Sequence, residues 1–282
     1  MQIISTIKGL LDTLDAPHRE GLSIGLVPTM GALHAGHASL VERSVKENAL
    51  TVVSVFVNPT QFNDATDLAN YPRTLEADAM LLESLGADFV FAPEAQEIYP
   101  TPDTRHFDYP PITSVMEGPR RPGHFNGVCQ IVSKLFFFVK PTRAYFGEKD
   151  FQQIAVVRAM VDDLKIPVKI VACPIVREVS GLALSSRNTL LSEQERELAV
   201  NISRILFFSK AYAASHTIAA TQAFVVDALN SLEGLEVEYF EIVDGKTLQG
   251  VTSWEAAESV VGCITVYCGA RPVRLIDNIR YR

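Results

Sequence analysis

The chain has 282 residues, of which 48% are hydrophobic and 21% are charged, and its formal net charge at neutral pH is −8. This balance is typical of a soluble globular protein, and the length suits one large domain with a smaller second domain. An acidic chain without a dense cluster of Lys and Arg is repelled by a phosphate backbone, which argues against a nucleic-acid partner and favours a small nucleotide.

Nothing in the sequence indicates export or insertion into a membrane. The amphipathic N-terminus, residues 1–15, lacks the basic, apolar and small-residue order of a signal peptide. No window approaches the ~18 uninterrupted apolar residues of a membrane span. The four cysteines form no C-x-x-C pair, which favours buried free thiols in a reducing compartment. We therefore expect a cytoplasmic protein with no membrane partner.

Apolar runs alternate with amphipathic runs along the first 175 residues. The amphipathic segments 40–49, 74–85 and 151–164 predict helices, and Gly86 follows the second of them as a left-handed cap. The apolar runs between them indicate strands buried on both faces, so the repeated order predicts a parallel sheet with right-handed crossovers. These runs are 23–27, 51–57, 88–92, 143–147 and 168–173, and a proline-rich, irregular passage occupies 93–123.

The pattern changes after residue 177. Residues 190–206 form a helical pattern that opens on Ser192 and Glu195, which have the spacing of a capping box, and a second helical pattern covers 218–231. Alternating stretches at 237–244, 259–270 and 274–279 then indicate a few hairpin-like strands. We predict an α/β fold with a parallel-sheet domain at 1–177 and a smaller α+β domain at 178–282.

Ligands of open parallel sheets bind beyond the carboxyl ends of the strands, and three predicted strand ends are followed by unusual loops. The first loop, residues 28–37, contains Gly31 and Gly36, which let the backbone approach a ligand closely. His37 falls in the first turn of a helix, where free N–H groups favour an anion. His34 lies three residues earlier, so both imidazoles can face one side and donate hydrogen bonds to phosphate oxygens.

The other two loops carry cations. Residues 147–150 open a helix with Lys149, a mobile positive charge, and residues 176–188 follow the last parallel strand. In the latter loop two hydroxyls precede a permanent cation, a group that suits a phosphate tail: Ser185, Ser186 and Arg187. We therefore expect the three loops to converge on one triphosphate.

Amide side chains also follow the predicted strands. Asn58 and Gln61 end the buried strand at 51–57, and Gln152 and Gln153 open the helix at 151. Amides from different strand ends, aimed at a common cleft, can hold a small polar substrate by its hydroxyls and its carboxylate.

Each of these motifs is weak when it is taken alone. The two histidines can be plain helix-start residues, or they can bind zinc, which requires a third ligand; His124 is the only other histidine in a suggestive setting. The run 135–140 indicates core packing. The signatures GxGxxG and GxxxxGK[ST] are absent, which argues against a dinucleotide oxidoreductase and a P-loop enzyme.

In combination, six motifs resemble those of pantoate–β-alanine ligases, the pantothenate synthetases. They are PTMGALHAGHASL, SVFVNPTQF, NYPRT, RPGHFNGV, FGEKDFQQ and GLALSSRN, in this order. The resemblance is dense from the first strand to about residue 190 and much less distinctive beyond it. The family belongs with the HxGH-type nucleotidyltransferases, for which residues 34–37 carry the signature, so the resemblance implies a Rossmann-like core.

The resemblance implies a reaction in two steps, with ATP as a substrate and Mg²⁺ as the accompanying ion. Pantoate and ATP would give pantoyl adenylate and pyrophosphate, and β-alanine would then attack the adenylate to give pantothenate and AMP. The partners would be these small molecules and, in a homodimer, a second copy of the chain. A mobile cover over the intermediate is expected, and the polar segment 63–72 is our candidate for it.

The resemblance also implies residue roles, and it implies no protein ligand for a metal. The catalytic residues would be His34, His37 and Lys149, with His37 the proton donor. Pantoate would be bound by Gln61, Gln153, Asn58 and Arg121, with Met30 nearby. ATP would be bound by Met30, Gly31, Ala32, Leu33, His34, Ala35, Gly36, His37, Gly147, Glu148, Lys149, Asp150, Val176, Leu184, Ser185, Ser186 and Arg187.

Two positions depart from the family pattern. Ser180 replaces the usual acidic residue before GLA, and Leu184 replaces the usual methionine before SSR while it keeps an apolar contact. The alternatives to a ligase are a nucleotidyltransferase that acts on a phosphorylated acceptor, a metal-dependent hydrolase that uses the two histidines, and a nucleotide-binding regulator without activity. The first would need an additional cationic pocket, which the amides Gln61 and Gln153 do not supply.

Overall fold

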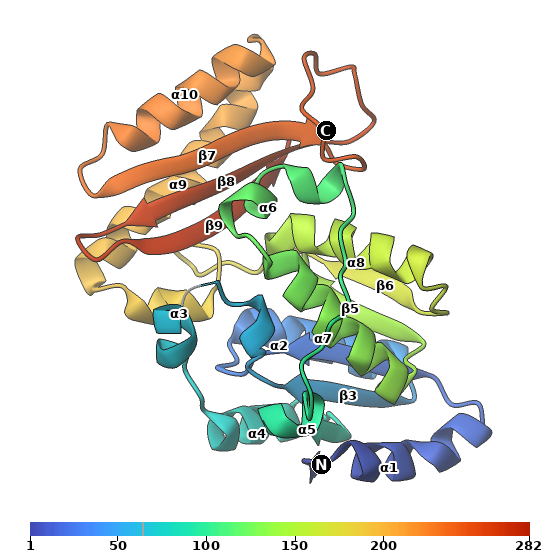
Figure 1. Ribbon diagram of the computed structural model, residues 1–282. Coiled ribbons are helices and arrows are strands. Elements are labelled where there is room, and N and C mark those ends of the chain that lie inside the picture. Colours follow the sequence, from blue (N-terminus) through green and yellow to red (C-terminus); the bar gives the residue numbers. More distant parts are fainter. Residues whose placement is uncertain (64) are drawn as a thin grey trace. The chain divides into compact units, whose positions relative to one another are not determined.

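The computed structural model describes residues 1–63 and 65–282, which form two compact units (Figure 1). The first unit contains Met1–Tyr109, Arg120–Glu148 and Gln153–Pro174. The second unit contains Pro110–Pro119, Lys149–Gln152 and Ile175–Arg282. The domain boundary near residue 177 stays a prediction.

A six-stranded parallel sheet forms the centre of the first unit, which confirms the predicted α/β fold with a parallel sheet. Its strand order is β1-β4-β3-β2-β5-β6. The edge strand β1 was not predicted, because three residues show no periodicity and two of them are exposed. The strands are β1 (Gln2–Ile4), β2 (Ile24–Thr29), β3 (Leu50–Val55), β4 (Phe89–Phe91), β5 (Arg143–Gly147) and β6 (Lys169–Cys173).

The strand order reverses its direction at β2. From β2 the chain continues through β3 to β4 on one side, whereas β5 and β6 lie on the other side. The loops that leave the carboxyl ends of β2 and β5 therefore diverge, and in open α/β sheets a ligand binds at such a switch point. Residues 30–37 and the start of the loop after β5 therefore both follow the carboxyl ends of strands at this switch point.

Helices cover both faces of this sheet (Figure 1). α2 and α4 pack together over a core that includes Val27, Val53 and Val90, and α1 packs with α7. Gly86 ends α4 with φ = 80°, as predicted. The helices are α1 (Ile7–Arg19), α2 (Ala35–Glu47), α3 (Ala65–Asn70), α4 (Leu75–Ser84), α5 (Ala95–Ile98), α7 (His124–Val139) and α8 (Phe151–Asp163), whose first two residues belong to the second unit.

The segment 63–72, which we predict to be a mobile cover, includes Asp64, which lies outside the described residues. Part of it is the short helix α3 rather than an irregular loop. Its role as a cover stays a prediction.

The second unit has the predicted α+β composition. Its antiparallel sheet has the order β7-β8-β9, and two helices share a hydrophobic core with it (Figure 1). The predicted capping box is present, since Ser192 Oγ accepts from the backbone N–H of Glu195 at 3.3 Å. The elements are α9 (Glu193–Ala213), α10 (Ile218–Asn230), β7 (Leu235–Asp244), β8 (Val260–Cys268) and β9 (Val273–Arg280), and α6 (Glu117–Arg120) begins in this unit.

All four cysteines are buried and free, as predicted. Burial raises the pKa of the Cys129 thiol to about 12 and that of Cys268 to about 11, so neither thiol is ionised at neutral pH. No helix within 1–63 and 65–282 is long and apolar enough to cross a membrane.

Candidate active site

The loop between β2 and α2 holds the two histidines at the start of a helix. His34 is the N-cap of α2, and its Nδ1 accepts from the backbone N–H of Gly36 at 3.1 Å. In return, Nδ1 of His37 accepts from the backbone N–H of His34 at 3.4 Å. The two ring centroids lie 4.1 Å apart, so the expectation that both imidazoles face one side is confirmed.

These hydrogen bonds determine which ring nitrogen carries the proton. A nitrogen that accepts a hydrogen bond carries none, so each neutral ring is protonated at Nε2. Both rings therefore keep an N–H donor on the atom farther from the backbone, at a helix N-terminus that favours anions. This arrangement can donate to phosphate oxygens.

A buried carboxylate on another element supports the same loop. Asp78, on α4, accepts from the backbone N–H groups of Ala32 and Leu33 at 3.0 and 2.8 Å. We did not single out Asp78 in the sequence because α4 carries several acids. The available signal was an acid at a position that an amphipathic helix turns toward the core; its exposed fraction is 3%.

The amide side chains after β3 form a network within the first unit. Asn58 is buried, and its Nδ2 donates to the carbonyl of Gly127 at 3.1 Å and to Gln61 Oε1 at 3.2 Å. The Asn58 Oδ1 accepts from the hydroxyl of Tyr99 at 2.8 Å. Gln61 Nε2 donates to Met30 Sδ at 3.0 Å, so the network reaches the histidine loop.

A second connection runs from Gln61 to the start of α7. His124 Nδ1 lies 2.9 Å from the carbonyl oxygen of Gln61, and its Nε2 lies 3.1 Å from Arg121 Nη1. Because a carbonyl can only accept, Nδ1 carries the proton and Nε2 accepts from the guanidinium. Gly127 permits the close packing, since a Cβ there would lie 2.2 Å from the carbonyl oxygen of Thr60.

Gln153 is the remaining predicted pantoate ligand. It lies in the first turn of α8 and is half-buried. Its side chain makes no hydrogen bond with another residue in the described part of the chain, in contrast to the neighbouring Gln152. Gln152 donates to the carbonyls of Ile112 and Val115 at 2.8 Å each and is therefore structural.

In the second unit, Lys149 and the Ser-Ser-Arg loop are both attached to β9. The carbonyl of Lys149 accepts from Asn278 Nδ2 at 3.2 Å, and its Nζ lies 3.2 Å from the carboxylate of Asp150. The preceding residue on β9, Asp277, accepts from both Nη atoms of Arg177 at 2.7 and 2.8 Å. Adjacent residues of one strand thus anchor the two predicted phosphate-binding segments.

The Ser-Ser-Arg loop is closed by local hydrogen bonds. Leu184 N–H donates to the carbonyl of Val176 at 3.0 Å, and Ser185 Oγ accepts from the N–H of Arg187 at 3.3 Å. Asn188 Nδ2 donates to the carbonyl of Ala183 at 3.0 Å, and its buried Oδ1 has no partner within residues 1–63 and 65–282. Asn188 was not among the predicted site residues, although an amide directly after the SSR motif was available as a signal in the sequence.

The sequence-predicted residues therefore fall into two groups. Within the first unit, Met30, Asn58, Gln61 and Arg121 belong to one hydrogen-bonded network beside the paired histidines, and Gly147 and Glu148 follow β5 at the switch point. Within the second unit, Lys149, Asp150, Val176 and residues 184–187 lie in segments tied to β9 or to one another.

The zinc alternative finds no third ligand among the residues described. No group of three or more His, Cys, Asp or Glu side chains that could hold a metal ion occurs within 1–63 and 65–282. Both ring nitrogens of His124, the histidine considered for this role, are already engaged by Gln61 and Arg121.

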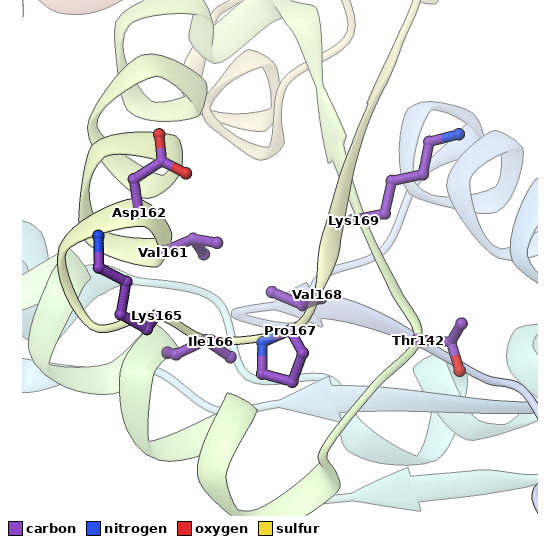
Figure 2. Close-up of a pocket in the computed structure, with 8 residues that line it drawn as sticks. All are labelled: Thr142, Val161, Asp162, Lys165, Ile166, Pro167, Val168 and Lys169. Atoms are coloured by element: carbon purple, nitrogen blue, oxygen red, sulfur yellow. The ribbon is translucent and has the colours of Figure 1, made fainter.

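An open depression of about 700 Å³ lies elsewhere in the first unit (Figure 2). Its lining runs from Thr142, just before β5, to Lys169, the first residue of β6, and includes the end of α8. It therefore lies at the amino ends of these strands, whereas the histidine loop follows the carboxyl end of β2. None of the predicted site residues lines it.

Comparison with known proteins identifies the family of this chain. The family model described as pantoate-beta-alanine ligase matches residues 2–280. A pantothenate synthetase of Phocaeicola vulgatus is 65% identical, with 100% of both chains covered. The crystal structure of pantothenate synthetase from Thermus thermophilus is 43% identical and has a TM-score of 0.93, covering 100% of this chain and 99% of that one.

A further solved structure is described with bound ligands. It is the pantoate-beta-alanine ligase of Francisella tularensis complexed with beta-gamma ATP and beta-alanine, at 35% identity and a TM-score of 0.84, with 100% of this chain and 98% of that one covered. Identity of this extent over the whole chain, together with the family model, establishes membership. The chain belongs to the pantoate–β-alanine ligase family.

Proposed function

This chain is an ATP-dependent ligase that joins pantoate to β-alanine in pantothenate biosynthesis, and we propose which of the residues described above act in each step of the reaction. The first step forms pantoyl adenylate. A carboxylate oxygen of pantoate bonds to the α-phosphorus of ATP, the bond from that phosphorus to the bridging oxygen breaks, and pyrophosphate leaves. Negative charge therefore develops on the phosphoryl and leaving oxygens, and donors held in place beforehand stabilise it.

Donors for the first step come from both groups of residues. The Nε2–H groups of His34 and His37 are aimed by their Nδ1 bonds, and His37 is the proton donor in the proposal. Lys149 supplies a charge for the transferring phosphate. Ser185, Ser186 and Arg187 hold the β and γ phosphates, while Gly147, Asp150, Val176 and Leu184 surround the adenine and ribose.

Pantoate is held by the amide side chains. Gln153, which has no side-chain partner in the described part of the chain, and Gln61, which lies in the Asn58 network, offer both donors and acceptors for its hydroxyls and carboxylate. Arg121 is oriented by His124 and supplies a positive charge for the substrate carboxylate. Met30 provides an apolar contact next to Gln61.

The second step forms the amide. The amine of β-alanine attacks the acyl carbon of the adenylate, the bond from that carbon to the phosphate oxygen breaks, and AMP leaves while the nitrogen loses a proton. A mixed anhydride is already reactive, so this step depends mainly on positioning and on the exclusion of water. The cover that excludes water is assigned to the segment 63–72.

Mg²⁺, a homodimer and a cytoplasmic location belong to the same proposal. Mg²⁺ commonly binds through the phosphates of a nucleotide, so in the proposal the ion is held by ATP and no side chain of the protein is assigned as its ligand. The ion would add positive charge at the triphosphate. The homodimer and the location rest on the family resemblance, and light scattering of the purified protein tests the former.

The assignment of pantoate to the amide side chains beside the histidines rests on the hydrogen bond between Gln61 and Met30. This bond connects the amide network after β3 to the histidine loop after β2, at the carboxyl ends of two neighbouring strands. The test is pyrophosphate–ATP exchange, measured with and without pantoate before any β-alanine is added. We expect exchange only in the presence of pantoate. Exchange without pantoate, or none with it, would contradict an adenylate formed on pantoate.

A further inference from the structure

The side chain of Asp78 is enclosed by hydrogen-bond donors. Its Oδ2 accepts from the N–H of Ala32 at 3.0 Å, and its Oδ1 accepts from the N–H of Leu33 at 2.8 Å and from the hydroxyl of Thr74 at 3.3 Å. The side chain is buried, so these three donors replace the water that a carboxylate would otherwise bind.

The loop that Asp78 holds has an unfavourable backbone. Gly31 has φ = 83° and Ala32 has φ = 50°, so two successive residues adopt the left-handed region. Glycine tolerates this region, but a residue with a Cβ does so at a cost that its surroundings must offset. Consecutive N–H groups in such turns form a concave nest that binds an anion. Here the anion in the nest is the carboxylate of Asp78.

This contact changes the expected use of the loop. The N–H groups of Ala32 and Leu33, which by resemblance belong to the ATP-binding segment, donate to the protein's own carboxylate. The next residue is His34, whose N–H donates to His37 and whose ring caps α2. These two N–H groups are therefore held by the protein itself, and the position of the imidazoles that follow them depends on the conformation of residues 31–33.

We propose that Asp78 is a positioning residue for the adenylation step: by occupying the nest formed by Ala32 and Leu33, it sets the place of the His34 and His37 imidazoles. The inference rests on the proposed function, because it assumes that these imidazoles meet the phosphates of ATP. Asp78 itself touches no substrate in this scheme. Its charge serves to keep the strained loop in one conformation.

The test compares Asp78→Asn with Glu76→Gln. Both substitutions remove one negative charge from the first turns of α4, but Glu76 is exposed and lies outside the nest. In Asp78→Asn one carboxylate oxygen becomes an NH₂ group that faces a backbone N–H. We expect pyrophosphate–ATP exchange at saturating substrates to fall about 100-fold in Asp78→Asn and to stay within twofold of wild type in Glu76→Gln.

Two further readouts distinguish positioning from a general loss of structure. Pantoate affinity, measured by calorimetry, should stay within about threefold of wild type, because Asp78 bonds to Ala32, Leu33 and Thr74 and not to the amide network. The ¹⁵N shifts of His34 and His37 should change in Asp78→Asn, since the caps loosen. Wild-type exchange, unchanged imidazole shifts, or an equal loss of pantoate affinity would each overturn the inference.

A second variant guards against a failure to fold. The double variant Asp78→Asn with Ala32→Gly has a glycine at position 32, which adopts the left-handed conformation without the cost of a Cβ. It should therefore recover most of the melting temperature that Asp78→Asn loses, while its exchange rate stays low. Recovery of the exchange rate to that of wild type would contradict a positioning role for the carboxylate. If wild-type protein shows no pantoate-dependent exchange, the proposed function fails, and the imidazole shifts alone decide whether Asp78 holds the loop.

Discussion

The imidazole rings of His34 and His37 lie 4.1 Å apart, and each uses Nδ1 to accept a backbone N–H at the start of α2. In the proposed mechanism, helix capping and phosphate binding therefore use different nitrogen atoms of the same ring. Nδ1, the nitrogen nearer the backbone, caps the helix, and Nε2 carries the proton and can donate a hydrogen bond to a phosphate oxygen.

The substitution His37→Asn separates these two tasks. The Oδ1 of asparagine can stand where Nδ1 stands and accept the N–H of His34, but no atom replaces the Nε2–H donor. We expect the rate of pantoate-dependent pyrophosphate–ATP exchange to fall about 100-fold or more, as it does when a transition-state donor is lost, while the melting temperature stays near that of wild type.

The matched variant is His37→Ala, which loses both the donor and the cap. Its exchange rate should equal that of His37→Asn, and its free energy of unfolding should be lower by about 1 kcal/mol. A wild-type exchange rate in His37→Asn would remove His37 from the catalytic step.

Truncation of Gln61 should separate the two substrates of the first step. Gln61→Ala removes the amide that the proposal assigns to pantoate and leaves the histidine loop in place. We expect the pantoate dissociation constant to rise about tenfold or more, because polar groups of the bound substrate lose a partner, while ATP affinity is unchanged. Isothermal titration of each substrate measures both quantities.

The control for Gln61 is Gln96→Ala, which truncates an exposed glutamine of the same unit outside the amide network. Its pantoate affinity should stay within about threefold of wild type. If Gln61→Ala binds pantoate as wild type does, the amide network has been assigned to the wrong substrate.

Much of the fold is predictable because its elements are periodic and bounded by local signals. The strands of the parallel sheet appear as apolar runs, and the caps at Gly86 and Ser192 are set by residues within one helical turn. The helix α7 was not assigned because it is buried almost all round, and a continuous apolar run has no period to separate helix from strand. The edge strand β1 is too short to show any pattern.

The site was predictable only in part, for a related reason. Residues such as His34, Lys149 and Arg187 belong to compact motifs, whereas their supports lie far away in the chain. Asp78 is 45 residues from Leu33, and Asp277 is 100 residues from Arg177. A carboxylate in a helix with several acids carries no local mark of such a distant partner, so only the tertiary structure identifies it.

Stability at low pH should depend on Asp103. The hydrogen bonds from the Arg105 guanidinium lower the pKa of this carboxyl to about 2. An unfolded aspartate titrates near 3.9, so the folded state binds the proton less well. The carboxylate therefore contributes stability that is fully present above pH ~4 and is lost as the pH falls toward about 2.

Asp103→Asn removes this contribution at every pH. We expect the free energy of unfolding at pH 7 to fall by about 1–3 kcal/mol, because Arg105 loses a charged partner, and its decrease between pH 4 and pH 2 to become shallower than in wild type. Urea unfolding at several pH values measures both. Asp12→Asn, at an exposed pair with Lys8, serves as control and should change neither. A wild-type slope in Asp103→Asn would show that other carboxyls dominate.

The last prediction concerns the anchor of the Ser-Ser-Arg loop. Asp277 is buried and binds Arg177 through two parallel hydrogen bonds, which hold the start of the segment 176–188 on β9. Asp277→Asn leaves a largely buried guanidinium without its counter-charge, so we expect a loss of about 3 kcal/mol in the free energy of unfolding. The KM for ATP should rise while the pantoate dissociation constant stays the same, because Gln61 and Asn58 belong to the first unit.

The control is Asp15→Asn, which breaks an exposed pair with Arg19; it should change the free energy of unfolding by less than about 1 kcal/mol and leave the binding of both substrates unaffected. An unchanged KM for ATP in Asp277→Asn would leave two explanations: the loop that carries Arg187 keeps its conformation without this anchor, or the loop does not contact the nucleotide. The variant Arg187→Ala separates them, because its KM for ATP stays unchanged only if the loop does not contact the nucleotide.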